Sequence, residues 1–266
     1  MKRRTRRILF ISAIAIFILC SYVAILYAQG YKYSFRDNKF VRTGAIYLDV
    51  NTSAKVYFND KLVGSTSFIG NAFSKGGLLP GQYMIRITRD GYTTWQKKTI
   101  VEEGFVIDFP KVMILPENEE ERAKLIVEIE GLLNSAKPEL SPTPKIKIPS
   151  PTPNFNAPFY LKDKILYKNE ESQKEIIDRN VQGFVVSQNE SRIAWWNNNN
   201  EIWVMWLRDT GYQPYHKDAD KELLTRFSTK IKNIGWFRDE DHIVVDSLGY
   251  KIVELDTRGG INIIKL

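Results

Sequence analysis

The sequence predicts a mainly β protein behind an N-terminal transmembrane helix, and three observations support this fold class. A run without any charged residue extends from Ile8 to Ala28. Short segments with apolar residues at every second position follow one another from Gly44 to Leu115, and this spacing is typical of β-strands. Within residues 159–266 a similar segment recurs at an offset of 50 residues. The expected order is a transmembrane helix, a small β-sandwich, a linker helix and a partial propeller-like β domain.

The N-terminal segment has the length and charge pattern of a membrane anchor. At about 1.5 Å per residue, a helix over residues 8–28 spans the roughly 30 Å hydrocarbon core of a bilayer. The alternatives are a buried core helix and a cleaved signal peptide, whose apolar region is shorter, about 7–15 residues. The basic head, residues 1–7, favours a cytoplasmic N-terminus. We therefore expect a single-pass protein of the cell membrane with its C-terminal domains on the extracytoplasmic side.

The net charge of +7 does not indicate nucleic-acid binding, because most of it lies in the head. The basic residues of the head are Lys2, Arg3, Arg4, Arg6 and Arg7. Subtracting these five charges leaves +2 for the remaining chain, which is not the basic surface that a nucleic-acid partner requires. Cys20 is the only cysteine and lies within the predicted span, so we expect no disulfide within the chain.

Residues 31–115 predict a small β-sandwich close to the membrane. The segments AIYLDV, AKVYFN, YMIRIT, QKKTIV and FVIDF alternate in polarity, and turn signals such as Pro80-Gly81 and Asp90-Gly91 separate them. Strands at about 8–12-residue spacing are typical of all-β sandwiches. The aromatic and basic residues 31–42 suit either the membrane–water interface or an edge strand.

Two connecting segments follow the sandwich. Residues 118–136 predict a linker helix with Asn118 as its N-cap and an apolar stripe that includes Leu125 and Ile129. We expect this stripe to pack within the chain; packing on another copy is the alternative. Residues 137–158 contain seven prolines and predict an extended spacer.

Residues 159–266 predict propeller-like repeats. The segments FVVSQNESRIAWW (184–196) and IGWFRDEDHIVVD (234–246) align, and a weaker copy covers residues 164–180. A period of about 40–50 residues with four strands per unit is typical of propeller blades. About two and a half blades fit into the segment, so three arrangements stay open: a truncated propeller, a propeller completed by another copy, or an open sheet.

Residues 44–115 resemble the PEGA domain, a small extracytoplasmic β-sandwich module. The resemblance rests on GAIYLDVNTSAKVYFNDKLVGST and on LLPGQYMIRITRDGYTTWQKKTIV. Its landmark residues are Pro80, Gly81, Tyr83, Gly91, Tyr92 and Trp95. Ser67 stands where the family often has proline, and the connection SFIGNAFSKGGL is longer than usual. We expect the landmark residues to frame the module, with Tyr92 and Trp95 covering the end of the sandwich.

Residues 159–266 are similar to the blades of TolB-like and WD-type propellers. SQNESRIA (187–194) occupies the place of the Ser-Pro-Asp-Gly-Lys-x-Ile-Ala turn of those blades, and DEDHI (239–243) does so in the next copy. Both copies lack the Pro and Gly of that pattern. The resemblance implies a propeller-like fold.

The sequence predicts no metal site and no cofactor. His216 lies near Asp218 and Asp220, but their spacing fits no standard zinc or calcium loop, so we expect a solvated loop. His242 is expected to belong to a hairpin turn. The sequence also lacks the Gly-x-Ser-x-Gly, P-loop, His-Glu-x-x-His and Rossmann glycine patterns.

No catalytic residue is predicted either, and we do not expect an enzyme. The three acids Asp239, Glu240 and Asp241 could supply the paired carboxylates that glycoside hydrolysis requires. Adjacent acids in a tight turn, however, normally point apart into water.

Tryptophans gather in the propeller-like segment and form a candidate binding platform. They are Trp195, Trp196, Trp203, Trp206 and Trp236. Aromatic residues at sheet interfaces usually belong to the core; the alternative is a stacking surface for sugar or peptide. Strand alternation places Trp195 and Trp196 on opposite faces.

These features predict a membrane-anchored, non-catalytic scaffold or binding protein of the cell envelope. Its expected partners are the membrane and a surface polysaccharide, peptidoglycan or an envelope protein, and a homo-oligomer is compatible with the sequence. One alternative is an envelope carbohydrate-active enzyme with its site in the C-terminal β domain. Another is an assembly or signalling subunit that acts through the linker helix. The sequence does not identify the ligand.

Overall fold

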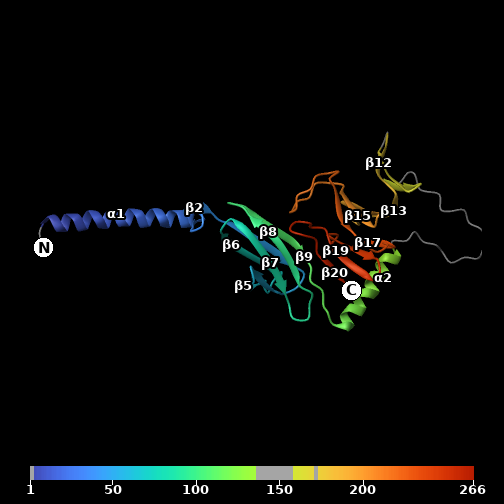
Figure 1. Cartoon of the computed structure of the whole chain (residues 1–266), viewed down its shortest axis with the longest axis horizontal. Helices are drawn as coiled ribbons and strands as arrows, with labels where there is room; N and C mark the ends of the chain where they lie inside the picture. The colour runs from blue at the N-terminus through green and yellow to red at the C-terminus, as the bar shows by residue number, and fades with distance from the viewer. Residues whose placement is uncertain (1–2, 136–157, 171–172) are drawn as a thin grey trace, which may run out of the picture. The chain divides into compact units, whose positions relative to one another are not determined.

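The computed structural model describes residues 3–135, 158–170 and 173–266, and it is mainly β, with two helices and several separate sheets (Figure 1). The predicted fold class is confirmed. The contacts divide the chain into two compact units: Met1–Arg86 with Lys98–Val112, and Ile87–Lys97 with Met113–Leu266. The predicted proline spacer lies outside the described residues except for Pro158.

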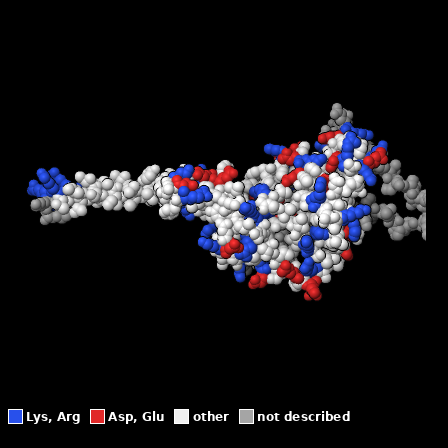
Figure 2. Space-filling view, viewed as in Figure 1, with Lys and Arg blue, Asp and Glu red and all other residues white. Residues whose placement is uncertain are grey.

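The N-terminal helix α1 (Arg3–Ala28) is long and apolar enough to cross a membrane, by length and composition. None of its described side chains is buried. Figure 2 shows Lys and Arg at its N-terminal end and no charged side chain along the rest of the visible helix. A hairpin of β1 (Tyr31–Ser34) and β2 (Lys39–Arg42) follows. The Gly30 carbonyl accepts hydrogen bonds from the Thr43 backbone N–H (2.9 Å) and hydroxyl (2.7 Å), which closes this hairpin.

Seven further strands form two sheets that are compatible with the predicted sandwich. In chain order they are β3 (Gly44–Val50), β4 (Lys55–Phe58), β5 (Lys61–Ser65), β6 (Ala72–Leu78), β7 (Gly81–Thr88), β8 (Trp95–Val101) and β9 (Val106–Val112). The sheets have the strand orders β6-β3-β9 and β5-β4-β7-β8. Alternate side chains are fully buried, among them Ile46 and Leu48 of β3 and Ile85 and Ile87 of β7, as the period-2 pattern requires.

One strand lies where the sequence indicated only a long connection. β6 pairs antiparallel with β3, and its segment reads Ala-Phe-Ser-Lys-Gly-Gly-Leu. None of its side chains is fully buried. The polarity alternation that marks a half-buried strand is therefore missing from this segment.

The second unit contains three successive antiparallel sheets. The first has β10 (Phe159–Lys162), β11 (Ile165–Glu170) and β12 (Gln173–Arg179). The second has β13 (Val181–Val186), β14 (Arg192–Asn197), β15 (Glu201–Trp206) and β16 (Lys221–Arg226). The third has β17 (Asn233–Phe237), β18 (His242–Asp246), β19 (Tyr250–Glu254) and β20 (Ile263–Lys265). The two aligned sequence repeats form equivalent strand pairs: β13 with β14 in the second sheet, and β17 with β18 in the third.

Apolar clusters join each sheet to the next. Phe159 and Leu166 of the first sheet pack with Ile193 and Trp195 of the second. The opposite face of the second sheet packs against the third in another cluster that includes Trp196. All six residues of β14 are therefore buried, since sheets cover both of its faces.

The linker helix α2 (Glu119–Ser135) covers the face of the third sheet that is turned away from the second. The Asn118 side-chain oxygen caps the helix by accepting the Glu121 N–H at 2.8 Å. Its apolar stripe, including Ile129, is buried in one cluster with Phe237, Val244 and Ile252. The predicted packing within the chain is confirmed. A further blade stacked on the third sheet would need the face that α2 occupies.

Candidate functional site

The landmark residues of the PEGA resemblance lie in the turns before β7 and β8 and in the first residues of these strands. The Tyr83 hydroxyl donates to the Leu79 carbonyl at 2.9 Å, and burial raises the pKa of Tyr83. Gly91 has a φ of 75°, a left-handed conformation that suits glycine. Tyr92 forms a β-bridge with Pro116. These contacts are structural, which is the role expected for residues that frame the module.

Trp95 has a different environment from the predicted end of the sandwich, because it belongs to a polar cluster inside the second unit. Its indole N–H donates to the Glu254 carboxylate at 3.2 Å. The Lys97 ammonium lies 3.3 Å from the same carboxylate, and the Lys97 side chain is completely buried. Burial raises the pKa of Glu254, while Lys97 and Asn262 oppose this shift. Lys97 and Glu254 therefore form an ion pair away from solvent.

The five tryptophans do not form one exposed platform, so that hypothesis was wrong. Trp196, Trp206 and Trp236 belong to the core between the second and third sheets. Trp195 is completely buried on the other face of the second sheet, where the half-buried Trp203 stacks on it. The alternation between Trp195 and Trp196 is as predicted, and each face of the second sheet packs against a neighbouring sheet.

His216 is half-buried instead of lying in a solvated loop, so the expected environment was wrong. Its ring stacks on Trp206 with 3.5 Å between centroids, and its side chain is 15% exposed. Burial lowers the pKa of His216. The nearest Asp220 oxygen is 4.0 Å away. Among the described residues, no group of three or more His, Cys, Asp or Glu side chains is placed to hold a metal ion.

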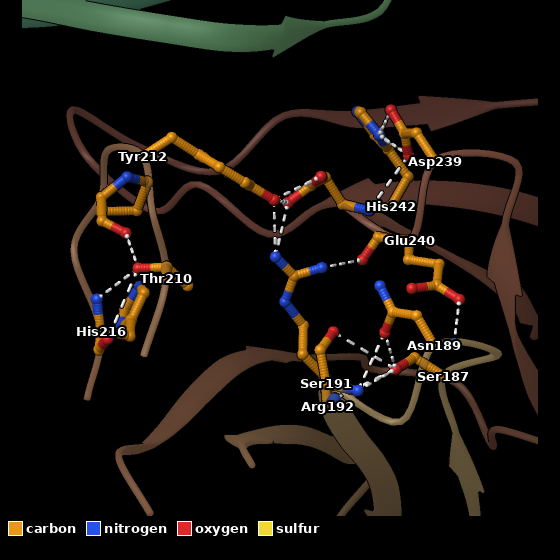
Figure 3. A network of polar contacts seen from close by, with 12 residues as sticks. Ser187, Asn189, Ser191, Arg192, Thr210, Tyr212, His216, Asp239, Glu240 and His242 are labelled. Carbon is orange, nitrogen blue, oxygen red and sulfur yellow. Dashed lines mark hydrogen bonds and ion pairs between the residues drawn. The ribbon is translucent and has the colours of Figure 1, made fainter. Parts of the chain in front are cut away.

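The acidic turn 239–241 also differs from its expected exposure. Asp241 is buried, and one of its carboxylate oxygens lies 3.1 Å from an Arg192 guanidinium nitrogen. The Tyr212 hydroxyl accepts from Arg192 at 2.7 Å and donates to Asp241 at 2.7 Å. Figure 3 shows the Arg192 guanidinium between Tyr212 and Glu240, whose carbonyl accepts another of its N–H groups at 2.8 Å. The expected exposure to water is wrong, because Asp241 is buried and Asp239 and Glu240 are half-buried.

The neighbouring residues of this network are fixed by local turns. Asp239 accepts hydrogen bonds from the Asp241 N–H at 3.0 Å and pairs with His242 Nδ1 at 3.0 Å. His242 therefore holds a hairpin turn, as expected. In the equivalent turn of the second sheet, the Ser187 hydroxyl accepts the N–H groups of Ser191 and Arg192, each at 3.0 Å (Figure 3).

The network joins the second sheet to the third through side-chain hydrogen bonds and an ion pair. Burial, followed by the charge of Asp241, raises the pKa of Tyr212 to about 12, so this hydroxyl keeps its proton at neutral pH. Arg192 neutralises Asp241, and both side chains are at most 12% exposed. The sequence did not indicate that Arg192 lies close to the acidic turn 239–241, because Glu240 is 48 residues further along the chain.

A second carboxylate of the C-terminal domain is held in its charged form. Glu201 accepts hydrogen bonds from Arg226 Nε at 3.1 Å and from the Asn197 amide at 2.6 Å. Hydrogen bonding to Arg226, the largest contribution, lowers the pKa of Glu201 to about 2. Its ordinary value is 4.5, so the carboxylate stabilises the folded state fully above that pH.

We expect the free energy of unfolding to fall as the pH drops from about 4.5 to about 2, partly because Glu201 takes up a proton. Urea titrations of the wild type and of Glu201→Gln, followed by tryptophan fluorescence, measure this contribution. The difference in stability between the two proteins should shrink over this pH range. A difference that stays constant with pH would contradict the assignment.

The second unit also contains cavities. One of about 700 Å³ is lined by the end of α2 and by strands of all three sheets, including Glu130, Phe184, Trp196, Lys232 and Asp246. Another, of about 400 Å³, lies between Phe159, Val186 and Leu207. Only Trp196 among these residues was a candidate from the sequence, because a cavity formed by segments distant in sequence leaves no local pattern.

Comparisons with known proteins add no relative: no protein-family model matches the chain, and no curated protein matches it. The candidate site therefore depends on geometry and chemistry. The larger cavity combines aromatic walls, carboxylates and an ammonium group on described residues, which makes it the candidate binding site of the C-terminal domain.

Proposed function

We propose that this chain is a single-pass membrane protein with a cytoplasmic N-terminus, whose extracytoplasmic β domains act as a non-catalytic scaffold or binding protein of the cell envelope. The observation that carries the proposal is α1. Its apolar side chains, such as Phe10 and Phe17, are 68% and 71% exposed, and such a surface is stable in lipid rather than in water. The basic head favours the cytoplasmic side for the N-terminus.

The contacts of the polar residues support a non-catalytic role. Three of the residues that the sequence singled out as candidates for chemistry are engaged in structural pairs: Asp241 with Arg192, and Asp239 with His242. Those pairs hold turns and join sheets. A buried, neutralised carboxylate is poorly suited to acid–base catalysis, which requires a proton donor or acceptor within reach of a substrate.

The two β modules support the binding part of the proposal. We assign residues 44–115 to a PEGA-like sandwich and residues 159–266 to a TolB-like, partial propeller. The support is the pair of sheets whose strands β7 and β8 and the turns before them hold the landmark residues, and the three repeated sheets stacked in sequence. Such modules present a surface to a surface polysaccharide, to peptidoglycan or to another envelope protein.

Protease added to intact cells that produce the full chain is expected to remove the β domains and to spare an epitope tag at the N-terminus. Immunoblotting for the tag measures the protected fragment, and permeabilised cells serve as the control in which the tag is also lost. A tag that is cleaved in intact cells would overturn the orientation. Release of the chain from membranes by alkaline carbonate would overturn the anchor.

A further inference from the structure

The cavity of about 700 Å³ in the second unit has a composition that fits one class of ligand. Its volume lies within the roughly 300–1,000 Å³ typical of sites for small ligands. The C-terminal end of α2 forms one wall with Glu130 and Asn134. The third sheet contributes Asp246 and Tyr250, near the end where β18 finishes and β19 begins. The Arg192 network lies at the opposite end of β18, next to His242.

Aromatic side chains give the cavity apolar faces. The Trp196 ring lies directly against the backbone of Gly183, since a Cβ at that position would be only 2.2 Å from the ring. Glycine at this position therefore lets the indole lie flat against the strand. Phe184, the next residue of β13, is half-buried and also lines the cavity. The C–H faces of a sugar ring pack well on such surfaces.

Carboxylates and an ammonium group supply the polar contacts. Glu130 accepts a hydrogen bond from the Tyr250 hydroxyl at 3.3 Å through one oxygen. Asp246 lies 3.5 Å from the Lys232 ammonium, also through one oxygen. The second oxygen of each carboxylate has no hydrogen bond to any residue that the structure describes. Each is therefore an available acceptor, and Lys232, 67% exposed, is an available donor.

We propose that this cavity binds a short, neutral oligosaccharide. Sugar hydroxyls both donate and accept hydrogen bonds, so they match a wall that carries both carboxylates and an ammonium group. Two carboxylates against one ammonium group leave a net charge of about −1 at the charged part of the lining, which disfavours anions. The inference extends the proposed binding function by naming the site and the ligand class.

Isothermal titration calorimetry on the full-length protein tests the inference with three neutral probes: cellotriose, maltotriose and triacetylchitotriose. The protein is kept in lauryldimethylamine oxide, because the headgroup of this detergent contains no sugar. We expect saturable binding of at least one trisaccharide, weakened about ten-fold or more by Glu130→Gln and by Asp246→Asn, since each removes a charged acceptor.

Asn134→Trp provides an independent variant that adds bulk at the cavity wall without removing a buried group, because Asn134 is exposed. It is expected to abolish binding. Glu120→Trp adds the same bulk at an exposed position in the first turn of α2, about 20 Å away along the helix, and should leave binding unchanged. Circular dichroism confirms that each variant is folded.

Three results would overturn the inference: no saturable binding of any trisaccharide, equal binding by Asn134→Trp and the wild type, or binding of trilysine in preference to the sugars. The protease experiment does not involve the cavity. A lack of sugar binding with a protected N-terminal tag would therefore reject this inference and leave the proposed anchor and orientation standing.

Discussion

Replacing Arg192 with methionine is expected to lower the free energy of unfolding of the second unit by about 3–5 kcal/mol. The substitution keeps an apolar stem of similar length but removes the Arg192 guanidinium, which lies 3.1 Å from the Asp241 carboxylate. The Asp241 carboxylate then stays buried without its counter-charge, and the Glu240 carbonyl loses a donor at 2.8 Å. A buried carboxylate that loses its counter-charge costs far more stability than the loss of a surface ion pair.

Urea unfolding followed by tryptophan fluorescence measures this effect. All six tryptophans lie in the second unit, so the signal reports on that unit alone. Arg208→Met is the matched control, because Arg208 is exposed and donates to a single carbonyl, that of Asn189, at 3.2 Å. A loss below about 1 kcal/mol for Arg192→Met, the size typical of surface pairs, would contradict the buried-pair interpretation.

A double substitution separates the charge from the packing. Arg192→Met combined with Asp241→Leu removes both charges, and replacing a buried ion pair with apolar residues is often neutral or stabilising. We therefore expect the double variant to be more stable than Arg192→Met alone, with a coupling energy that the mutant cycle measures. A double variant that is as unstable as the sum of both single changes would show that the two side chains act independently.

Periodicity predicted much of the fold because most elements carry it in their own residues. β3, with its buried and half-buried side chains in alternation, and β8, which alternates buried and exposed, follow the period-2 pattern. The stripe of α2 follows the 3.6-residue period. β14 is different: every residue from Arg192 to Asn197 is buried. The sequence indicates such a strand only by its apolar content, and the covering sheets on both faces become visible only in three dimensions.

The candidate site was harder to predict, because its interactions join residues that are distant in sequence. Asp239 and Asp241 stand two positions apart in one turn, yet the first bonds His242 and the second bonds Arg192 from another sheet. The local sequence pattern does not distinguish the environments of these two acids. Similarly, Trp203 and Trp206 lie in one strand, but they face different clusters. The role of each side chain depends on which sheet covers it.

Helix α2 takes the place where a further blade would stack, and this gives the second large effect. Ile129 is completely buried among Phe237, Val244 and Ile252 of the third sheet. Ile129→Ala leaves a cavity between the helix and the sheet, for which the expected loss in the free energy of unfolding is about 2–5 kcal/mol. The change does not disturb the helix itself, because alanine has the higher helix propensity.

Val127→Ala is the matched control for Ile129→Ala, since Val127 lies two residues away on the same helix and is 68% exposed. Its stability should change by less than about 0.5 kcal/mol. Urea unfolding by tryptophan fluorescence compares the two variants with the wild type. If Ile129→Ala is no less stable than Val127→Ala, the helix does not pack on the third sheet in solution. That face would then be open to a further blade or a second copy. If only Ile129→Ala lowers the free energy of unfolding, the Ile129 side chain packs on the third sheet in solution. Helix α2 then covers the outer face of the last sheet.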